Sequence, residues 1–188
     1  MGMPDVVRHW TREEVLALPE DGTRYELVDG ELLVSPSPRF PHQRAVRELT
    51  FLVGPYVEAH GVGEVIFSPS DLDLRSGHLV QPDLFVVDRA TLRGAGDWSD
   101  VGIPRLVIEV LSPSTARYDR ITKRRLYQRV GVPVYWVVDL DARLVEMWRP
   151  EEAAPGIVDG TLTWQPEPGV PPLRIDLPAF FRGILDRS

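Results

Sequence analysis

The sequence predicts a single α/β domain in which a mixed β-sheet lies between helices. Its 188 residues are enough for one domain with a substantial core. Segments with the periodicity of strands alternate with two long segments of helical periodicity, the pattern of a sheet covered by helices. Residues 132–139, VPVYWVVD, are apolar almost without interruption, which is typical of a strand covered on both faces.

The N-terminal elements are predicted from turn and capping signals. TREE at 11–14 is a capping box, and we expect a short helix from Thr11 to about Leu18. YELVDGELLV at 25–34 places Asp29-Gly30 between two short apolar strands, a strong signal for a two-residue β-hairpin.

The middle of the chain predicts the first long helix, over residues 42–60, and three strands. The inward stripe of this helix consists of Val46, Leu49, Val53 and Val57, with Pro55 inside the pattern. Strands are expected at 63–69, at 79–88 (LVQPDLFVVD) and at 105–112 (RLVIEVLS).

The last elements follow a second long helix over 116–130. After the strand at 132–139, residues 142–150 and 159–165 suggest a closing hairpin, and 167–178 a proline-rich connection. AFFRGIL at 179–185 suggests a last helical turn. We therefore expect a core of about residues 22–150, followed by a C-terminal hairpin and short helix within 151–188.

Composition limits the classes of protein. The chain has no cysteine, so disulfides and thiolate metal sites are excluded, and a reducing compartment, the cytoplasm, is expected. No secretory signal and no run of ~20 apolar residues is found, so no membrane contact is expected. The net charge of −7 argues against tight non-specific binding to duplex DNA, which depends on basic surfaces.

The second long helix carries the one lysine of the chain, since 20 arginines and Lys123 make up the 21 basic residues. At about 100° per residue, Lys123 and Asp119 fall on the apolar side of the helix, with Leu126 and Tyr127. The outward side consists of Arg117, Arg120, Arg124, Arg125 and Arg129. An i,i+4 surface pair explains Asp119 and Lys123 only if they are exposed, whereas a buried ammonium needs partners.

Two acidic residues interrupt apolar strands. Glu109 shares a strand face with Val107 and Leu111, and Asp83 begins another apolar run. Asp83 could be a turn residue, and Glu109 could simply pair with Lys123 or an arginine. If their strands are neighbours, the two carboxylates repel unless a proton, a lysine or a metal ion lies between them. A divalent metal held by Asp83 and Glu109, with Lys123 nearby, explains all three residues.

Three segments resemble the Uma-two family, bacterial proteins of the PD-(D/E)xK restriction-endonuclease-like superfamily. They are YELVDGELLVSPSPRFPHQ at 25–43, QPDLFVVD at 81–88 and PRLVIEVLSPSTARYDRITKRRLYQRVGVPVYWVVD at 104–139, and the resemblance extends over roughly residues 10–180. It implies a restriction-endonuclease-like core with extra N- and C-terminal hairpins. Asp83 matches the aspartate of the motif and Glu109 its second acid. Leu111 stands where the lysine is expected, and the resemblance implies that Lys123 replaces it from the following helix.

The resulting hypothesis is a metal-dependent endonuclease that hydrolyses phosphodiester bonds of DNA. Mg²⁺, or Mn²⁺, would be held by Asp83, Glu109 and the carbonyl of Val110, with Lys123 as the third catalytic residue and Asp119 positioning it. The supporting candidates are His42, which opens the first helix, Glu31 and Asp71. Arg120 and Arg124 are candidate contacts for nucleic acid.

Two other functions stay open at this point. One is a catalytically inactive nuclease fold retained for binding or dimerisation, which the acidic charge and the displaced lysine favour. The other is a metal-dependent hydrolase of a smaller phosphate ester. A homodimer is also expected if both strands of a duplex are cut, because that needs two sites.

Overall fold

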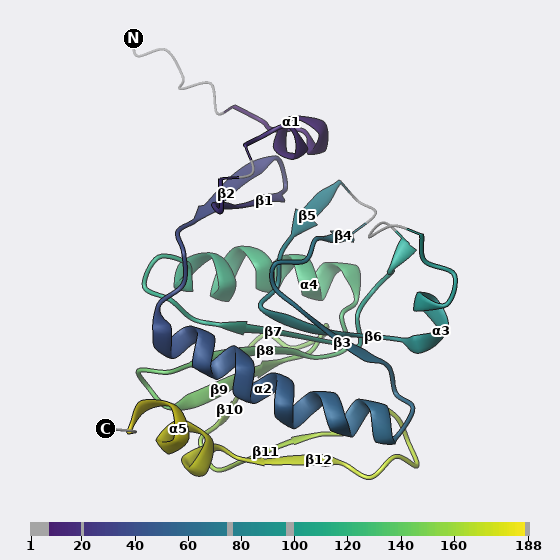
Figure 1. Ribbon diagram of the computed structural model, residues 1–188, viewed down its shortest axis with the longest axis vertical. Helices are drawn as coiled ribbons and strands as arrows, with labels where there is room; N and C mark the ends of the chain where they lie inside the picture. Colours follow the sequence, from purple (N-terminus) through teal and green to yellow (C-terminus); the bar gives the residue numbers. More distant parts are fainter. Residues whose placement is uncertain (1–7, 20, 75–76, 97–99, 187–188) are drawn as a thin grey trace.

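The computed structural model describes residues 8–19, 21–74, 77–96 and 100–186. In this part of the chain the strands form a six-stranded, a four-stranded and a two-stranded sheet. Figure 1 shows α2 on one side of the large sheet and α4 on the other, with the small N-terminal sheet above α4. The predicted mixed α/β architecture with helices on both faces is confirmed.

The six-stranded sheet has the strand order β10-β9-β8-β7-β6-β3. Its strands are β3 (Glu64–Phe67), β6 (Leu84–Val87), β7 (Leu106–Val110), β8 (Tyr135–Asp139), β9 (Leu144–Trp148) and β10 (Gly156–Val158). β7 and β8 are parallel, and the neighbouring pairs are antiparallel. The parallel pair requires a crossover, which the helix at 118–130 supplies.

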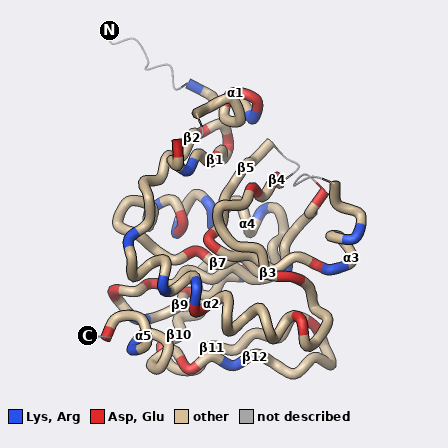
Figure 2. Tube along the Cα trace, viewed as in Figure 1, with Lys and Arg blue, Asp and Glu red and all other residues tan. Residues whose placement is uncertain are grey.

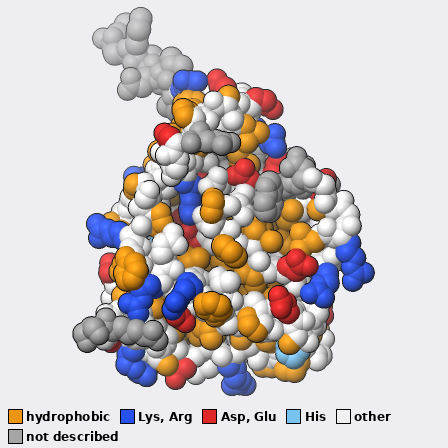
Figure 3. Space-filling model, in the orientation of Figure 1, with side chains coloured by type: hydrophobic (Ala, Val, Ile, Leu, Met, Phe, Trp, Pro, Cys, Tyr) orange, Lys and Arg blue, Asp and Glu red, His pale blue; other side chains and the backbone are white. Residues whose placement is uncertain are grey.

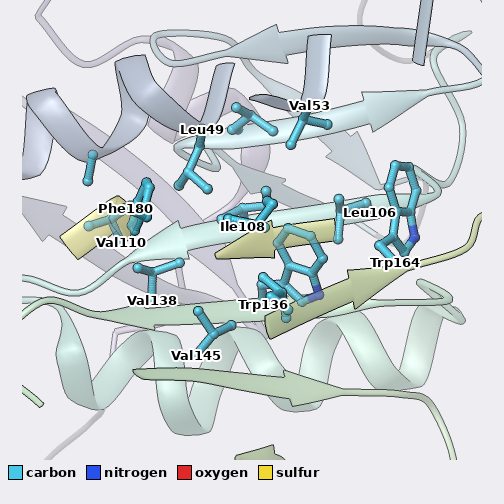
Figure 4. Close-up of a cluster of buried hydrophobic side chains, with 14 of the residues drawn as sticks. Leu49, Val53, Leu106, Ile108, Val110, Trp136, Val138, Val145, Trp164 and Phe180 are labelled. Atoms are coloured by element: carbon cyan, nitrogen blue, oxygen red, sulfur yellow. The ribbon is translucent and has the colours of Figure 1, made fainter. Parts of the chain in front are cut away.

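Side chains of the central strands alternate between two hydrophobic cores. Leu106 and Ile108 face α2, where they meet Leu49 and Val53 (Figure 4). Leu84, which pairs with Ile108, belongs to the same core. The residues between them along the strands face the opposite helix, with Phe85, Val87 and Val107 against Leu126 and Tyr127. Both faces are therefore buried, as the uninterrupted apolar strands predict.

The first long helix, α2, runs from Phe40 to Ala59. Its predicted stripe is buried, since Val46 is 8% exposed and Val53 and Val57 are fully buried. Pro55 does not break the helix. The carbonyl that it leaves without an intrahelical donor belongs to Phe51, which lies on the exposed side, where water can bind it.

The N-terminal hairpin consists of β1 (Arg24–Val28) and β2 (Glu31–Ser35). Val28 pairs with Glu31, so Asp29-Gly30 is the two-residue turn, and both have positive φ, 52° and 80°. β4 (Leu72–Leu74) and β5 (His78–Val80) complete this sheet in the order β2-β1-β5-β4. α1 (Arg12–Leu16) has the predicted capping box between Thr11 and Glu14 and packs on β1.

The single strand predicted at 79–88 is wrong. The strand is interrupted at Pro82, and the segments on either side are β5 and β6, which belong to different sheets. Proline has no N–H for a ladder, and the N–H groups on either side of it are used elsewhere. Gln81 N donates to Glu26 Oε1 at 2.7 Å and Asp83 N to Glu109 Oε2 at 3.3 Å, so the break supplies donors to buried carboxylates.

The closing hairpin between 142–150 and 159–165 is also wrong. β9 pairs with β8 through a short turn, which is the more local pairing, and with β10 on its other edge. Residues Thr161–Trp164 form β11, which pairs with β12 (Leu173–Asp176) inside the segment expected as an irregular connection. The last turn is a full helix, α5 (Leu177–Leu185), with α3 (Arg89–Leu92) earlier in the chain.

None of the helices in the described ranges is both long and apolar enough to cross a membrane. On the face drawn in Figure 3, the described lysine and arginine side chains are spread among acidic and apolar ones rather than gathered into one basic surface.

Candidate active site

The second long helix contains an irregularity that positions two charged side chains. Tyr118–Lys123 is a π-helical segment, η2, and Arg124–Val130 continues as α4. π-helical turns occur often at functional sites. Asp119 and Lys123 both point inward from η2 and are each only 2% exposed. The predicted inward position of the single lysine is therefore confirmed.

The ammonium group of Lys123 lies among three carboxylates. Its Nζ is 2.8 Å from Glu26 Oε1, 2.9 Å from Glu109 Oε1 and 3.4 Å from Asp119 Oδ1. Burial alone would lower the pKa of Lys123, but the charges of Glu109, Glu26 and Asp119 raise it well above its usual value. Lys123 is therefore a permanent cation.

Asp83, just before β6, accepts hydrogen bonds on both carboxylate oxygens. Oδ1 accepts from both terminal nitrogens of Arg24 at 3.1 Å, and Oδ2 accepts from Val110 N at 2.9 Å and lies 3.0 Å from His42 Nε2. Burial raises the pKa of Asp83, but the bond and charge of His42, the charge of Arg24 and the Val110 N–H together lower it to about 2. Asp83 is therefore ionised at neutral pH.

The pKa values of Glu109 and Asp119 are raised, in contrast to that of Asp83. Burial raises the pKa of Glu109 well above its usual value; Lys123 opposes this, and Asp119, Asp83 and Glu26 add to it. Burial likewise raises the pKa of Asp119 to about 6, against the lowering effect of Lys123. Tyr127 Oη donates to Glu109 Oε1 at 3.3 Å. The site thus holds carboxylates that ionise with difficulty beside one that ionises readily.

The charge of the cluster is not balanced. Four buried carboxylates, Glu26, Asp83, Glu109 and Asp119, face two cations, Arg24 and Lys123. With all four ionised and His42 neutral, the excess is two negative charges. Figure 2 shows acidic segments in the middle of the molecule, where β7 passes beside α4. A buried excess of this kind is relieved by protons or by a further cation.

Three adjoining cavities run past these residues. The central one, of about 200 Å³, is lined by Arg24, His42, Asp83, Glu109 and Lys123, and by the loops at 35–39 and 112–115. A second, of about 560 Å³, shares Arg24 and residues 35–38 with the first and continues along 68–71. A third, of about 210 Å³, shares Arg39 and His42 and extends to Arg120. The acidic cluster therefore lies at the cavity that shares wall residues with both of the others.

The donor atoms suit a hard divalent cation, which prefers carboxylate and carbonyl oxygens and water. In a strand, the N–H and C=O of one residue point to the same neighbouring strand. The Val110 carbonyl therefore points to the side on which its N–H reaches Asp83. With all four carboxylates ionised, the excess of two charges is the amount that such an ion would balance. Within the described ranges, however, no three acidic or histidine side chains are already arranged around one ion position.

Of the residues selected from the sequence, Asp83, Glu109, Val110, Asp119, Lys123 and His42 come together. Two acids lie outside the cluster. Glu31 is exposed at the turn of the hairpin, and Asp71 accepts a hydrogen bond from Gln81 Nε2 at 2.8 Å in the second cavity. Glu31 thus belongs to the turn, while Asp71 borders the site.

Arg120 and Arg124 both make contacts with other groups of the same chain. Arg120 lies 2.7 Å from Asp139 Oδ2 and 2.6 Å from Glu146 Oε1. Arg124 donates to the Arg120 carbonyl at 3.0 Å and covers the Trp148 ring at 4.7 Å. Contact of either guanidinium with nucleic acid would compete with these partners.

Sequence reasoning missed Glu26 and Arg24. Both lie on β1 in RYELV, where Arg24, Glu26 and Val28 share one face of the strand and Val28 is fully buried. A charged residue on the buried face of an apolar strand is the signal that identified Glu109, and it applies equally to Glu26.

The sequence matches the Uma2 family, described as "Putative restriction endonuclease", over residues 12–178. The chain belongs to the Uma2 family. The match covers most of the chain and includes every residue of the acidic cluster, so the resemblance noted from the three sequence segments is confirmed.

A solved structure agrees with this assignment. The crystal structure of "a putative nuclease belonging to DUF820 from Anabaena variabilis" superposes with a TM-score of 0.76 and 21% identity, covering 94% of this chain and 99% of that chain. This similarity establishes the fold, which is restriction-endonuclease-like. A comparison with curated proteins finds no match.

Proposed function

We propose that the protein is a metal-dependent endonuclease that hydrolyses phosphodiester bonds of DNA. One observation carries the proposal: Asp83, Glu109 and Lys123 converge in one cavity with an unbalanced buried negative charge. Membership of a family described as "Putative restriction endonuclease" supports nucleic acid as the substrate. The proposal includes Mg²⁺ or Mn²⁺ as the cofactor.

Asp83, Glu109 and the carbonyl of Val110 would hold the ion. A bound divalent cation supplies a water of lowered pKa and neutralises charge on the scissile phosphate. His42, 3.0 Å from Asp83 Oδ2, keeps that carboxylate ionised and fixed. The protein groups thus place two anions on adjacent strands at one point of the cavity.

Lys123 would act on the attacking water or on the phosphate. Two of its hydrogens are directed to Glu26 and Glu109, and its contact with Asp119 at 3.4 Å is the longest of the three. The third hydrogen is therefore the one available to stabilise developing negative charge. Asp119 would act through Lys123, because its Oδ1 lies 3.4 Å from the ammonium group and both side chains line the cavity.

Plasmid nicking tests the proposal. Wild type and the variants Asp83→Ala, Glu109→Ala and Lys123→Ala are compared with Mg²⁺ or Mn²⁺, and each variant is expected to lose roughly 10²-fold or more in rate. Glu146→Gln is the control, because it changes a buried acid outside the three cavities and should nick like wild type. Equal nicking by all five proteins would show a contaminating nuclease and remove the proposal.

The substrate is tested in parallel with supercoiled plasmid, single-stranded DNA, RNA and nucleoside monophosphate esters. Preference for DNA supports the proposed activity. Hydrolysis of the small esters alone would assign the site to a different substrate. A homodimer, required for cutting both strands at one place, predicts double-strand breaks that appear at the same rate as nicks.

A catalytically inactive binding module is the second candidate. It is favoured by the fact that both oxygens of Asp83 are already engaged with protein donors. Calorimetry separates the two functions, because an inactive module should give no heat with Mn²⁺ that depends on Glu109.

A further inference from the structure

Arg24 occupies a carboxylate oxygen of Asp83 that could otherwise bind a metal ion. Its terminal nitrogens NH1 and NH2 both donate to Asp83 Oδ1 at 3.1 Å, and NH2 also donates to Ser68 Oγ at 2.6 Å. Burial lowers the pKa of Arg24, but the charges of Asp83, Glu109 and Glu26 raise it above its usual value. Arg24 is therefore a permanent cation that neutralises the carboxylates from one side.

This arrangement leaves Asp83 without a free lone pair. Each carboxylate oxygen has about two acceptor sites. Arg24 uses both sites of Oδ1, and Val110 N and His42 use those of Oδ2. A direct bond between Asp83 and a metal ion therefore requires one of these donors to leave. The guanidinium and the ion would also repel each other at this distance.

Arg24 is the donor that can move. Val110 N is fixed in β7, and His42 is 6% exposed within the twenty-residue helix α2. The Arg24 side chain is 17% exposed and lines both the central and the second cavity. It can turn from Asp83 into the second cavity, whose walls carry serine hydroxyls of the loops at 35–38 and 68–71.

We propose that Arg24 is an exchangeable counter-ion. In the free protein it neutralises Asp83; when a divalent cation binds Asp83 and Glu109, the guanidinium leaves Oδ1 and binds a phosphate of the nucleic acid strand in the second cavity. A guanidinium binds phosphate with two parallel hydrogen bonds, as it binds a carboxylate, so one group serves both states. This inference rests on the proposed metal-dependent function.

The exchange has a consequence for binding. If the ion releases Arg24 toward the substrate, ion and nucleic acid each strengthen the binding of the other, since coupling between two sites is reciprocal. The coupling should disappear when residue 24 has no charge. A residue that only supports the fold would not produce coupling of this kind.

Calorimetry with Mn²⁺ tests the first half. EDTA-stripped wild type is compared with Arg24→Gln and with Arg12→Gln, a matched control that removes an arginine from another buried aspartate, Asp73, outside the cavities. Arg24→Gln is expected to bind Mn²⁺ at least ~10-fold more tightly than wild type, and Arg12→Gln is expected to bind it equally. Unchanged or weaker binding by Arg24→Gln overturns the inference.

Oligonucleotide binding tests the second half. A fluorescent single-stranded DNA is titrated in Ca²⁺ and in EDTA, with Ca²⁺ used to limit cleavage. Wild type should bind more tightly in Ca²⁺, and Arg24→Gln should lose this gain although it binds metal better. An equal gain in both proteins contradicts the exchange.

A third variant covers the case in which Arg24→Gln does not fold. Arg24→Lys keeps a cation beside Asp83 but has no planar fork for phosphate. It should keep Mn²⁺ affinity within ~3-fold of wild type and lose the Ca²⁺-dependent gain in DNA binding. If wild type itself gives no Mn²⁺ heat, the proposed function fails; if wild type binds Mn²⁺ and the variants behave like it, only the Arg24 exchange fails.

Discussion

Two basic residues three positions apart on the same π-helical segment meet their acidic partners in different ways. Arg120 pairs with Asp139 and Glu146, and its side chain is 37% exposed. Lys123 pairs with Glu26, Glu109 and Asp119, and its side chain is 2% exposed. Water screens the surplus negative charge around Arg120, whereas around Lys123 only protein groups, protons or a bound cation can do so.

The difference indicates which cluster is structural and which is suited to chemistry. The Arg120 cluster ties η2 to β8 and β9. The Lys123 cluster ties η2 to two different sheets, through Glu26 on β1 and Glu109 on β7, and does so at a cost in electrostatic free energy. Proteins accept such a cost mainly at functional sites.

The largest expected effect that separates the clusters is on stability. Lys123→Met leaves three buried carboxylates without their cation and should lower the free energy of unfolding by about 3–5 kcal/mol. Arg120→Met, at a partly exposed pair, should lower it by about 1 kcal/mol. Urea unfolding at pH 7 in EDTA measures both, and equal losses would show that burial does not distinguish the two clusters.

The two clusters should also respond to pH with opposite sign. The folded-state pKa of Asp119 is raised to about 6, so its stabilising contribution is complete at low pH and is lost as the pH rises through 6. At about 1.4 kcal/mol per pKa unit, the loss is about 3 kcal/mol. Burial raises the pKa of Asp139, but the Ala142 N–H and Arg120 lower it overall, so its contribution is lost as the pH falls.

Stability curves in EDTA from pH 4.5 to 7.5 check these signs. Asp119→Asn should remove the decline of wild type between pH 4.5 and about 6. Asp139→Asn should lower stability by the same amount at every pH of this range, because the pKa of Asp139 lies below it. Two variants with the same pH dependence would refute the assignment of a raised pKa to Asp119.

The smallest expected effect concerns one acid from each cluster. Glu26→Gln keeps an acceptor for Gln81 N and removes one surplus negative charge, so it should raise stability in EDTA by about 1 kcal/mol. Glu146→Gln weakens the bond to Arg120 and should lower stability by a similar amount. Thermal unfolding at pH 7.5 measures both, and destabilisation by Glu26→Gln would contradict the idea of a surplus.

Sequence patterns identified much of this site for simple physical reasons. Lys123 and Asp119 fall on the apolar side of a helical wheel, and Glu109 interrupts an apolar strand, so each needs a buried partner. The wheel assumed an α-helix, and the same side chains point inward from a π-helical segment because Leu126 and Tyr127 fix the direction of the helix.

The rest depended on long-range pairing that periodicity does not encode. Glu26 reaches the cluster only because β1 pairs with β5, which ends next to Asp83. Thr161–Trp164 pairs with Leu173–Asp176 across a proline-rich loop that hid the alternation of Leu173 and Ile175. Pairing is easier to predict for strands that follow one another in sequence. β1 and β5 do not, and the prolines before β12 hid the second strand of the β11–β12 pair.

The three residues 81–83, with Pro82 in the middle, connect β5 of the four-stranded sheet to β6 of the six-stranded sheet. The N–H of Gln81 donates to Glu26 and the N–H of Asp83 donates to Glu109. Lys123 forms ion pairs with both glutamates. Any sliding of the N-terminal sheet over the six-stranded sheet would move these two glutamates apart. The electrostatic potential at the ammonium group of Lys123 would then change. The electrostatic potential in the cavity therefore depends on the position of the N-terminal sheet relative to the six-stranded sheet.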